Sequence, residues 1–167
     1  MLCPRSWYYG EYLSLALANE KLTGPLGFGG RIHEALEAWG KGADALQTWE
    51  LLMSRDYACA DAVQLPDLSQ EDELGRIMLE GLVEWWDTEG EDQEFEVIGV
   101  EQKLSNVLTV ESVDIWLYGK LDQLLRHRES GQLWLRDYKT TRYLEDAFKD
   151  SVEWSPQPRI YAELVQR

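Results

Sequence analysis

Cysteine and histidine are scarce in this chain, with two of each in 167 residues, and basic residues are outnumbered by acidic ones, 16 to 31. Two cysteines far apart in the sequence do not form a disulfide framework, so a reducing cytoplasm is the expected location. No apolar run approaches the roughly 18 residues that a membrane-spanning helix needs. The first residues also lack the organisation of a signal peptide. We therefore expect a cytoplasmic protein with no membrane partner.

The net charge of -15 restricts the partners that the surface can attract. Long-range repulsion slows the encounter of an acidic protein with a polyanion, and phosphate contacts normally come from lysine and arginine. A bound divalent metal, the basic clusters at 126–128 and 139–142, or a partner or missing segment would offset this repulsion. The charge argues against autonomous tight DNA binding and says little about the chemistry.

The length and composition predict one domain with a substantial core, because 44% of the residues are hydrophobic and 11% are aromatic. We assign residues 1–167 to a single domain. Its N-terminal part, to about residue 92, has the patterns of helices. The remainder, from about residue 93, has the patterns of strands followed by a helix.

Apolar residues in the N-terminal part recur mostly at helical spacing. We expect helices at 1–20, after the glycine-rich break at 24–30, and from about 67 to 90, with short helical pieces and loop at 40–70. The buried stripe of the helix after the break is predicted to be Ile32, Ala35, Leu36 and Trp39. The stripe of the long helix is predicted to be Leu74, Ile77, Met78, Gly81, Leu82 and Trp85.

The pattern changes to alternating apolar and polar residues from about residue 94. Strands are expected at 95–102, 106–110, 113–122 and 133–139. A turn is expected at 129–131, and a last helix from about Pro156. Helices, then strands, then a helix indicate an α+β or mixed α/β fold.

Two aspartates and a lysine stand at related positions of two expected strands. Side chains alternate faces along a strand, so Asp137 and Lys139 point to the same side. A hairpin brings Asp122 near Asp137, and two converging carboxylates need a cation to offset their repulsion. Such oxygen ligands suit Mg²⁺ or Mn²⁺, and the arrangement is typical of phosphodiester hydrolysis. Taken singly, Asp122 also fits a strand-end aspartate, and Asp137 and Lys139 fit an exposed charge pair.

His33 and Glu101 are further candidates for the same site. As a nitrogen ligand, His33 would favour Mn²⁺ over Mg²⁺, although a capping or surface histidine is an alternative. Glu101 stands at the end of an expected strand. It would support the ligands from outside or face DNA, with an ordinary surface glutamate as the alternative.

Gln157 and Tyr161 are four residues apart on the last expected helix, so they share a face. A glutamine in an otherwise apolar stripe needs a polar partner. The carboxylate–lysine cluster or a DNA phosphate would supply that partner. The alternative is that both residues simply belong to the stripe that faces the sheet.

In this order the residues resemble the PD-(D/E)XK nuclease superfamily, in its RecB-like branch of recombination exonucleases and CRISPR-associated nucleases. Residues 30–34 resemble the G-x-x-H motif, and 100–102 resemble the acid-bearing first strand. Residues 119–122 resemble the G-x-x-D motif, and 137–140 resemble the (D/E)-x-K-T motif. Gln157 and Tyr161 match the Q-x-x-x-Y motif of the following helix.

The resemblance implies a restriction-endonuclease-like core, in which helices flank a central mixed sheet, and we expect that core to be incomplete at the C-terminus. It also implies a Mg²⁺ or Mn²⁺ site held by His33, Asp122, Asp137 and the backbone carbonyl of Tyr138. Lys139 would be catalytic. The residues expected to support Lys139 or contact DNA are Glu101, Gln157 and Tyr161.

The function implied is a metal-dependent DNA exonuclease of recombination, repair or phage replication, in the cytoplasm of a bacterial or phage-infected cell. Its substrate would be single- or double-stranded DNA ends, beside a helicase, recombinase or integrase. The alternative is a catalytically silent DNA-binding or scaffold module of the same fold. Cys3 resembles the first cysteine of members with a 4Fe–4S cluster, and Cys59 does not fit that pattern. A cluster is therefore expected only in a longer parent chain.

Overall fold

The computed structural model describes residues 8, 22–89, 91–141 and 155–165. The helix expected at 1–20 and the residue Cys3 lie outside this part. The helices are α2 (Pro25–Gly40), α3 (Ala45–Cys59), α4 (Leu65–Glu89), the short 3-10 helix η2 (Glu91–Glu94) and α6 (Gln157–Val165). The strands are β1 (Phe95–Val110), β2 (Val113–His127) and β3 (Leu133–Arg136).

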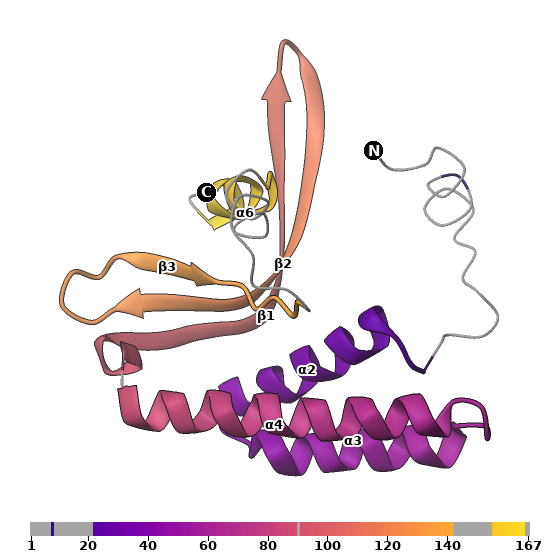
Figure 1. The fold of residues 1–167 in the computed structure, drawn as a ribbon. Coiled ribbons are helices and arrows are strands. Elements are labelled where there is room, and N and C mark those ends of the chain that lie inside the picture. Colours follow the sequence, from indigo (N-terminus) through magenta and orange to yellow (C-terminus); the bar gives the residue numbers. More distant parts are fainter. Residues whose placement is uncertain (1–7, 9–21, 90, 142–154, 166–167) are drawn as a thin grey trace.

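Helices α2, α3 and α4 form one layer, and the sheet lies on one side of it (Figure 1). The predicted stripe of α2 is confirmed at Ile32, Ala35 and Leu36, which are buried, while Trp39 is partly buried against them. The remaining buried members of this core come from α3 and α4, and they are Trp49, Met53, Leu68 and Leu79.

The stripe predicted for α4 is partly wrong, because Leu82 packs against the core as expected but three other large members of the stripe do not. Leu74, Ile77 and Trp85 are exposed, whereas Leu68 and Leu79 are buried. This helix carries apolar residues around much of its circumference, so periodicity alone left more than one candidate face. Packing against α2 and α3 selects the face that contains Leu68 and Leu79.

The loop and short helical pieces expected at 40–70 are replaced by the 15-residue helix α3 and the start of α4. The backbone N–H of Gln47 donates to the side chain of Asp44 at 2.9 Å, which caps the start of α3. The buried face of α3 includes a charged residue, Asp56, beside Leu52 and Met53. That charge interrupts the apolar stripe and explains why the helix is hard to recognise.

Arg31 joins the three helices through buried ion pairs. Its side chain is 4% exposed, and it pairs with Asp56 of α3 at 2.9 Å and with Glu71 of α4. The same guanidinium donates to the Leu22 carbonyl oxygen at 2.6 Å. A buried charge must be paired, so these contacts fix the rotation of α2 about its axis. Positions i and i+2 lie on opposite sides of a helix, so His33 is directed away from this core.

The three strands form an antiparallel sheet in the order β1-β2-β3. β1 is continuous, so the break expected between 102 and 106 is absent, although Glu101 has a positive φ of 53°. β2 continues past Asp122 to His127, so that aspartate lies within the strand and not at its end. β3 ends at Arg136, and Asp137 and Lys139 follow the strand.

The outer part of the β1–β2 hairpin projects as a long arm, and α6 lies beside its base (Figure 1). Close approach of the helix depends on Gly119, where a Cβ atom would lie 2.8 Å from a Tyr161 ring carbon and 2.7 Å from Leu164 Cδ1. The last helix begins at Gln157, one residue after the expected Pro156.

An arginine–tryptophan contact ties the helical layer to the sheet. The Trp39 ring of α2 lies 5.1 Å from the Trp86 ring of α4, and Arg136 of β3 lies 4.4 Å from the same Trp86 ring. The described elements form a mixed α+β structure that is consistent with a restriction-endonuclease-like core, as predicted. None of the helices in the described part is both long and apolar enough to cross a membrane.

Candidate metal centre

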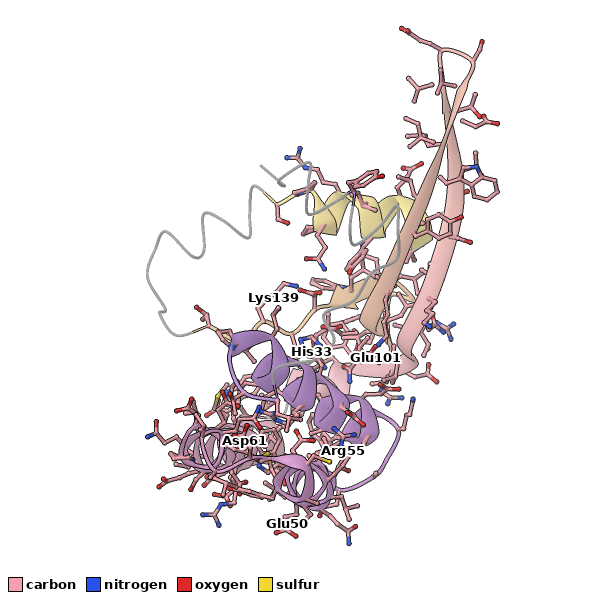
Figure 2. All side chains as sticks on the ribbon, turned by 90° about the vertical axis from the view of Figure 1, so that its right-hand side faces the viewer. His33, Glu50, Arg55, Asp61, Glu101 and Lys139 are labelled. Atoms are coloured by element: carbon pink, nitrogen blue, oxygen red, sulfur yellow. The ribbon has the colours of Figure 1, made fainter. Side chains whose placement is uncertain are left out.

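Three potential metal ligands converge where α2 meets the sheet. They are His33 from α2, Glu101 from β1 and Asp122 from β2, and one ligand atom of each lies within 4.8 Å of the others. We call these residues the metal group. Figure 2 shows His33, Glu101 and Lys139 gathered at this junction, while Glu50, Arg55 and Asp61 lie out on the helical layer. A cleft of about 420 Å³ opens at the metal group, and its lining is Gly30, His33, Glu34, Glu37, Glu101, Lys120 and Asp122.

Asp122 is buried in the sheet, with its side chain 11% exposed. Its Oδ1 atom lies 3.4 Å from Nδ1 of His33, and its Oδ2 atom accepts the backbone N–H of Tyr138 at 2.7 Å. Burial by itself raises the pKa of Asp122, but His33 and the Tyr138 amide outweigh that effect, so the pKa falls below its usual value. Asp122 is therefore ionised at neutral pH and available as an oxygen ligand.

His33 responds to the same interaction in the opposite sense. Hydrogen bonding to Asp122 raises the pKa of His33 more than partial burial lowers it, and the negative charges of Glu101 and Asp137 add to the rise. The imidazole thus lies in a strongly negative environment. A cation bound there would offset the negative charge of the surrounding carboxylates, as the proton on His33 does in its absence.

Glu101 and Lys120 pair across β1 and β2 at the edge of the cleft. The Glu101 side chain is 7% exposed and forms an ion pair with the ammonium group of Lys120. Hydrogen bonding to Glu101 is also the main cause that raises the pKa of Lys120. Lys120 therefore holds a carboxylate at the metal group while half of its own side chain remains exposed.

A second cluster lies beside the metal group and contains four predicted site residues, which we call the lysine group. Lys139 Nζ lies 2.6 Å from Asp137 Oδ2. The Gln157 amide nitrogen lies 3.2 Å from Asp137 Oδ1 and 2.7 Å from the Tyr161 hydroxyl oxygen. The polar partner of Gln157 in this structure is thus Asp137, and the lysine group is Asp137, Lys139, Gln157 and Tyr161.

The two groups are adjacent but distinct. The Tyr138 amide, between Asp137 and Lys139 in sequence, joins them by donating to Asp122. The structure brings Glu101 into the group of potential ligands, a place that the sequence did not assign to it. Asp137 instead contacts Lys139 and Gln157, and its charge reaches the metal group only through space.

Three residues that line the cleft escaped the sequence analysis. Glu34 and Glu37 share α2 with His33, and Lys120 shares β2 with Asp122. The spacing could have indicated part of this arrangement, since residues four apart on a helix (33 and 37) and two apart on a strand (120 and 122) share a face. Without the register of β1 against β2, these spacings did not identify a common cleft.

The donor set of the metal group fits a divalent cation. One imidazole and two carboxylates combine nitrogen and oxygen ligands, which suits Mn²⁺ and also permits Mg²⁺. The described part of the chain has no set of cysteine ligands for an iron–sulfur cluster, because Cys59 is its one cysteine and is free and exposed. The described residues therefore fit a divalent ion and do not fit a cluster.

Comparison with known proteins gives one family. A sequence model of the PD-(D/E)XK nuclease superfamily matches residues 1–167, which include the metal group and the lysine group. No curated protein and no solved structure matches the chain. Nucleases of this superfamily usually use divalent metals and act on DNA, in agreement with the acidic site between α2 and the sheet.

Proposed function

The chain belongs to the PD-(D/E)XK nuclease superfamily, and from that premise we propose that it is a divalent-metal-dependent DNA exonuclease of RecB-like type. The observation that carries the proposal is the convergence of His33, Glu101 and Asp122 within 4.8 Å, beside the Asp137–Lys139 pair. A catalytically silent module gains nothing from this concentration of acids, because converging carboxylates repel one another.

The residues proposed to hold the cation are His33, Glu101 and Asp122. The family motif adds Asp137 and the Tyr138 carbonyl, from the adjacent segment, as further proposed ligands. A cation there would supply positive charge that polarises the scissile phosphate and acidifies an attacking water. The water oxygen would form the new bond to phosphorus as the bond to the 3′ oxygen breaks, and a proton released by the water would balance the one that the 3′ oxygen takes up. The products are a 5′-phosphate and a 3′-hydroxyl.

Lys139 is proposed to orient the water and to offset charge that develops on the phosphoryl oxygens. Its ammonium group is 2.6 Å from Asp137, so the carboxylate restrains it. Gln157 bridges Asp137 and Tyr161, which makes the last helix a support for the lysine. A role in recombination, repair or phage replication, a helicase, recombinase or integrase partner, and a cytoplasmic location stay predictions.

The direct test is cleavage of end-labelled linear single- and double-stranded DNA with Mn²⁺ or Mg²⁺. Lys139→Ala should abolish cleavage and leave the fold intact, because this side chain is 42% exposed and belongs to no core. Arg76→Ala, an exposed residue of α4, is the matched control and should cleave normally. Release of mononucleotides would support exonuclease action, whereas internal fragments would indicate an endonuclease.

Two other results would contradict the proposal. Cleavage by Lys139→Ala at the unaltered rate would remove the role of that lysine. If the folded protein neither cleaves DNA nor binds Mn²⁺ by calorimetry, the silent DNA-binding or scaffold module is favoured. The net charge of -15 is a further argument for that alternative.

A further inference from the structure

One face of β2 carries a line of side chains that leads out of the metal group. Strand side chains alternate, so Trp116, Tyr118, Lys120 and Asp122 share a face. Asp122 belongs to the metal group, and Lys120 lines the same cleft. Farther out on the projecting arm, Trp116 and Tyr118 are 63% and 71% exposed. Trp116 is more exposed than the other tryptophans in the described part of the chain.

The neighbouring strand adds a second lysine to the same face. Lys103 of β1 stands directly opposite Lys120, and Ser105 stands opposite Tyr118. Side chains directly opposite in an antiparallel pair lie on the same side of the sheet. We call Trp116, Tyr118, Lys103 and Lys120 the hairpin track.

Helix α6 packs on the opposite face of the arm and leaves the hairpin track open. A Cβ at Gly119 would meet Tyr161 and Leu164 of α6, which places the helix on the face of the odd-numbered residues of β2. The burial pattern agrees, because Leu117 and Gly119 are partly covered while their even-numbered neighbours are exposed. The open face therefore leads toward Lys120, which lines the cleft.

The two aromatic rings have the geometry of a stacking platform. Their centroids are 6.3 Å apart and their planes differ by 14°. Bases in a duplex remain stacked at about 3.4 Å, so a duplex cannot place successive bases on these rings. A single strand can separate its bases to match this spacing, because each base has its own stacking face.

We propose that the hairpin track binds single-stranded DNA, with two bases stacked on Trp116 and Tyr118 and the phosphate backbone led past Lys103 and Lys120 to the metal group. This inference rests on the proposed nuclease function and adds a substrate class to it. At about 3.3 Å per residue, Tyr118 lies about 13 Å and Trp116 about 20 Å along the strand from Asp122. The track therefore holds the substrate strand several nucleotides away from the bond that is cut.

The net charge of the protein explains why aromatic residues would take part in binding a single strand. With a net charge of -15, the chain gains little from long-range attraction to phosphate, whereas base stacking requires no net charge. Lys103 provides local positive charge between the rings and the acidic cleft, whereas the charge of Lys120 is paired with Glu101. Asp114 shares this face beyond Trp116, where it accepts from Thr109 at 2.7 Å, so the basic and aromatic part ends there.

The test is fluorescence anisotropy with labelled oligothymidylate of roughly twenty nucleotides, longer than typical single-strand site sizes, and with a blunt duplex of the same length. Both are titrated in chelator so that no cleavage occurs. Trp116→Ala and Tyr118→Ala should each weaken single-strand binding roughly 5- to 150-fold and affect duplex binding little. Phenylalanine at either position should retain binding, because it preserves the stacking face. Trp85→Ala, an exposed tryptophan on α4, is the matched control.

Unchanged single-strand binding in both alanine variants would overturn the proposal, as would an equal loss for duplex and single strand. If the alanine variants instead lose self-association by light scattering while DNA binding is unaltered, the face is a protein contact and the proposal is wrong. Calorimetric Mn²⁺ titration of the same variants distinguishes a failure of the strand-binding proposal from a failure of the proposed nuclease function, because the hairpin track contributes no metal ligand. A protein that fails to bind metal contradicts the proposed nuclease, whatever the track binds.

Discussion

Replacing Gly119 by alanine should uncouple the last helix from the catalytic residues without removing any of them. The new Cβ would lie 2.7 Å from Leu164 Cδ1 and 2.8 Å from a Tyr161 ring carbon, whereas ordinary contacts begin at 3.4 Å. The Tyr161 and Leu164 side chains, or helix α6 that carries them, must therefore shift by roughly 0.7 Å or more to accept the methyl group. Because Tyr161 contacts Gln157, and Gln157 contacts Asp137, the movement reaches the Asp137–Lys139 pair.

Both stability and activity should change by measurable amounts. Inserting a methyl group into a packed contact costs about 1–3 kcal/mol, and the reduced freedom of the unfolded chain returns about 0.4–1 kcal/mol. We expect a net loss of up to about 2.6 kcal/mol in the free energy of unfolding, measured by urea denaturation. Cleavage should fall by on the order of 10- to 100-fold, because a displacement of about 1 Å in a supporting element has that effect.

Calorimetric Mn²⁺ affinity distinguishes this explanation from a general disturbance of the site. The metal group comes from α2, β1 and β2, so Gly119→Ala should retain most of its Mn²⁺ affinity and lose at most the contribution of Asp137, the proposed ligand that α6 contacts. Normal cleavage by Gly119→Ala would refute the coupling through α6. Loss of Mn²⁺ binding would show that the substitution acts through the sheet and would refute the reasoning equally.

Two further predictions concern the ligands and the core. Glu101→Gln should weaken Mn²⁺ binding by roughly tenfold or more, because even residues that only support ligands are worth about 10- to 100-fold. The control is Glu50→Gln, because Glu50 lies out on the helical layer (Figure 2). Equal Mn²⁺ affinities of the two variants by calorimetry would show that Glu101 is not a ligand. Gly75→Ala should destabilise the protein by about 1–3 kcal/mol in urea unfolding, because its Cβ would lie 2.1 Å from the buried Trp49 ring. Gly81→Ala on the same helix is the control, because its Cβ would meet nothing within 4 Å, and it should stabilise the protein by up to about 1 kcal/mol. Equal changes in the free energy of unfolding for the two variants would contradict the packing argument.

Local patterns predicted those parts of the fold in which one element determines its own face. Helix α2 has a narrow apolar stripe, so Ile32, Ala35 and Leu36 were identified as core from spacing alone. The face of α4 required knowledge of its neighbours. So did the existence of α3, because its buried Asp56 is stabilised by Arg31, 25 residues earlier in the chain.

The candidate site shows the same division between local and long-range information. The motif residues His33, Asp122 and Lys139 could be selected from sequence because each occupies a position of a recognisable pattern. Glu101 could not be placed, since its direction depends on a positive φ of 53° and on pairing between β1 and β2. Backbone conformation of that kind leaves no trace in spacing for a residue other than glycine.

The acidic character of the chain, which argues against DNA binding when counted over the whole surface, has a different meaning at the cleft. Four carboxylates line it, and they are Glu34, Glu37, Glu101 and Asp122. Lys120 and His33 offset only part of this charge, so a phosphate entering the cleft without a cation meets net repulsion. A divalent cation reverses that balance at the one place where the phosphate must approach, while the rest of the surface continues to repel the polyanion. Affinity for the strand outside the cleft must then come largely from interactions without net charge. The exposed rings of Trp116 and Tyr118 provide such interactions on the face that leads to Asp122.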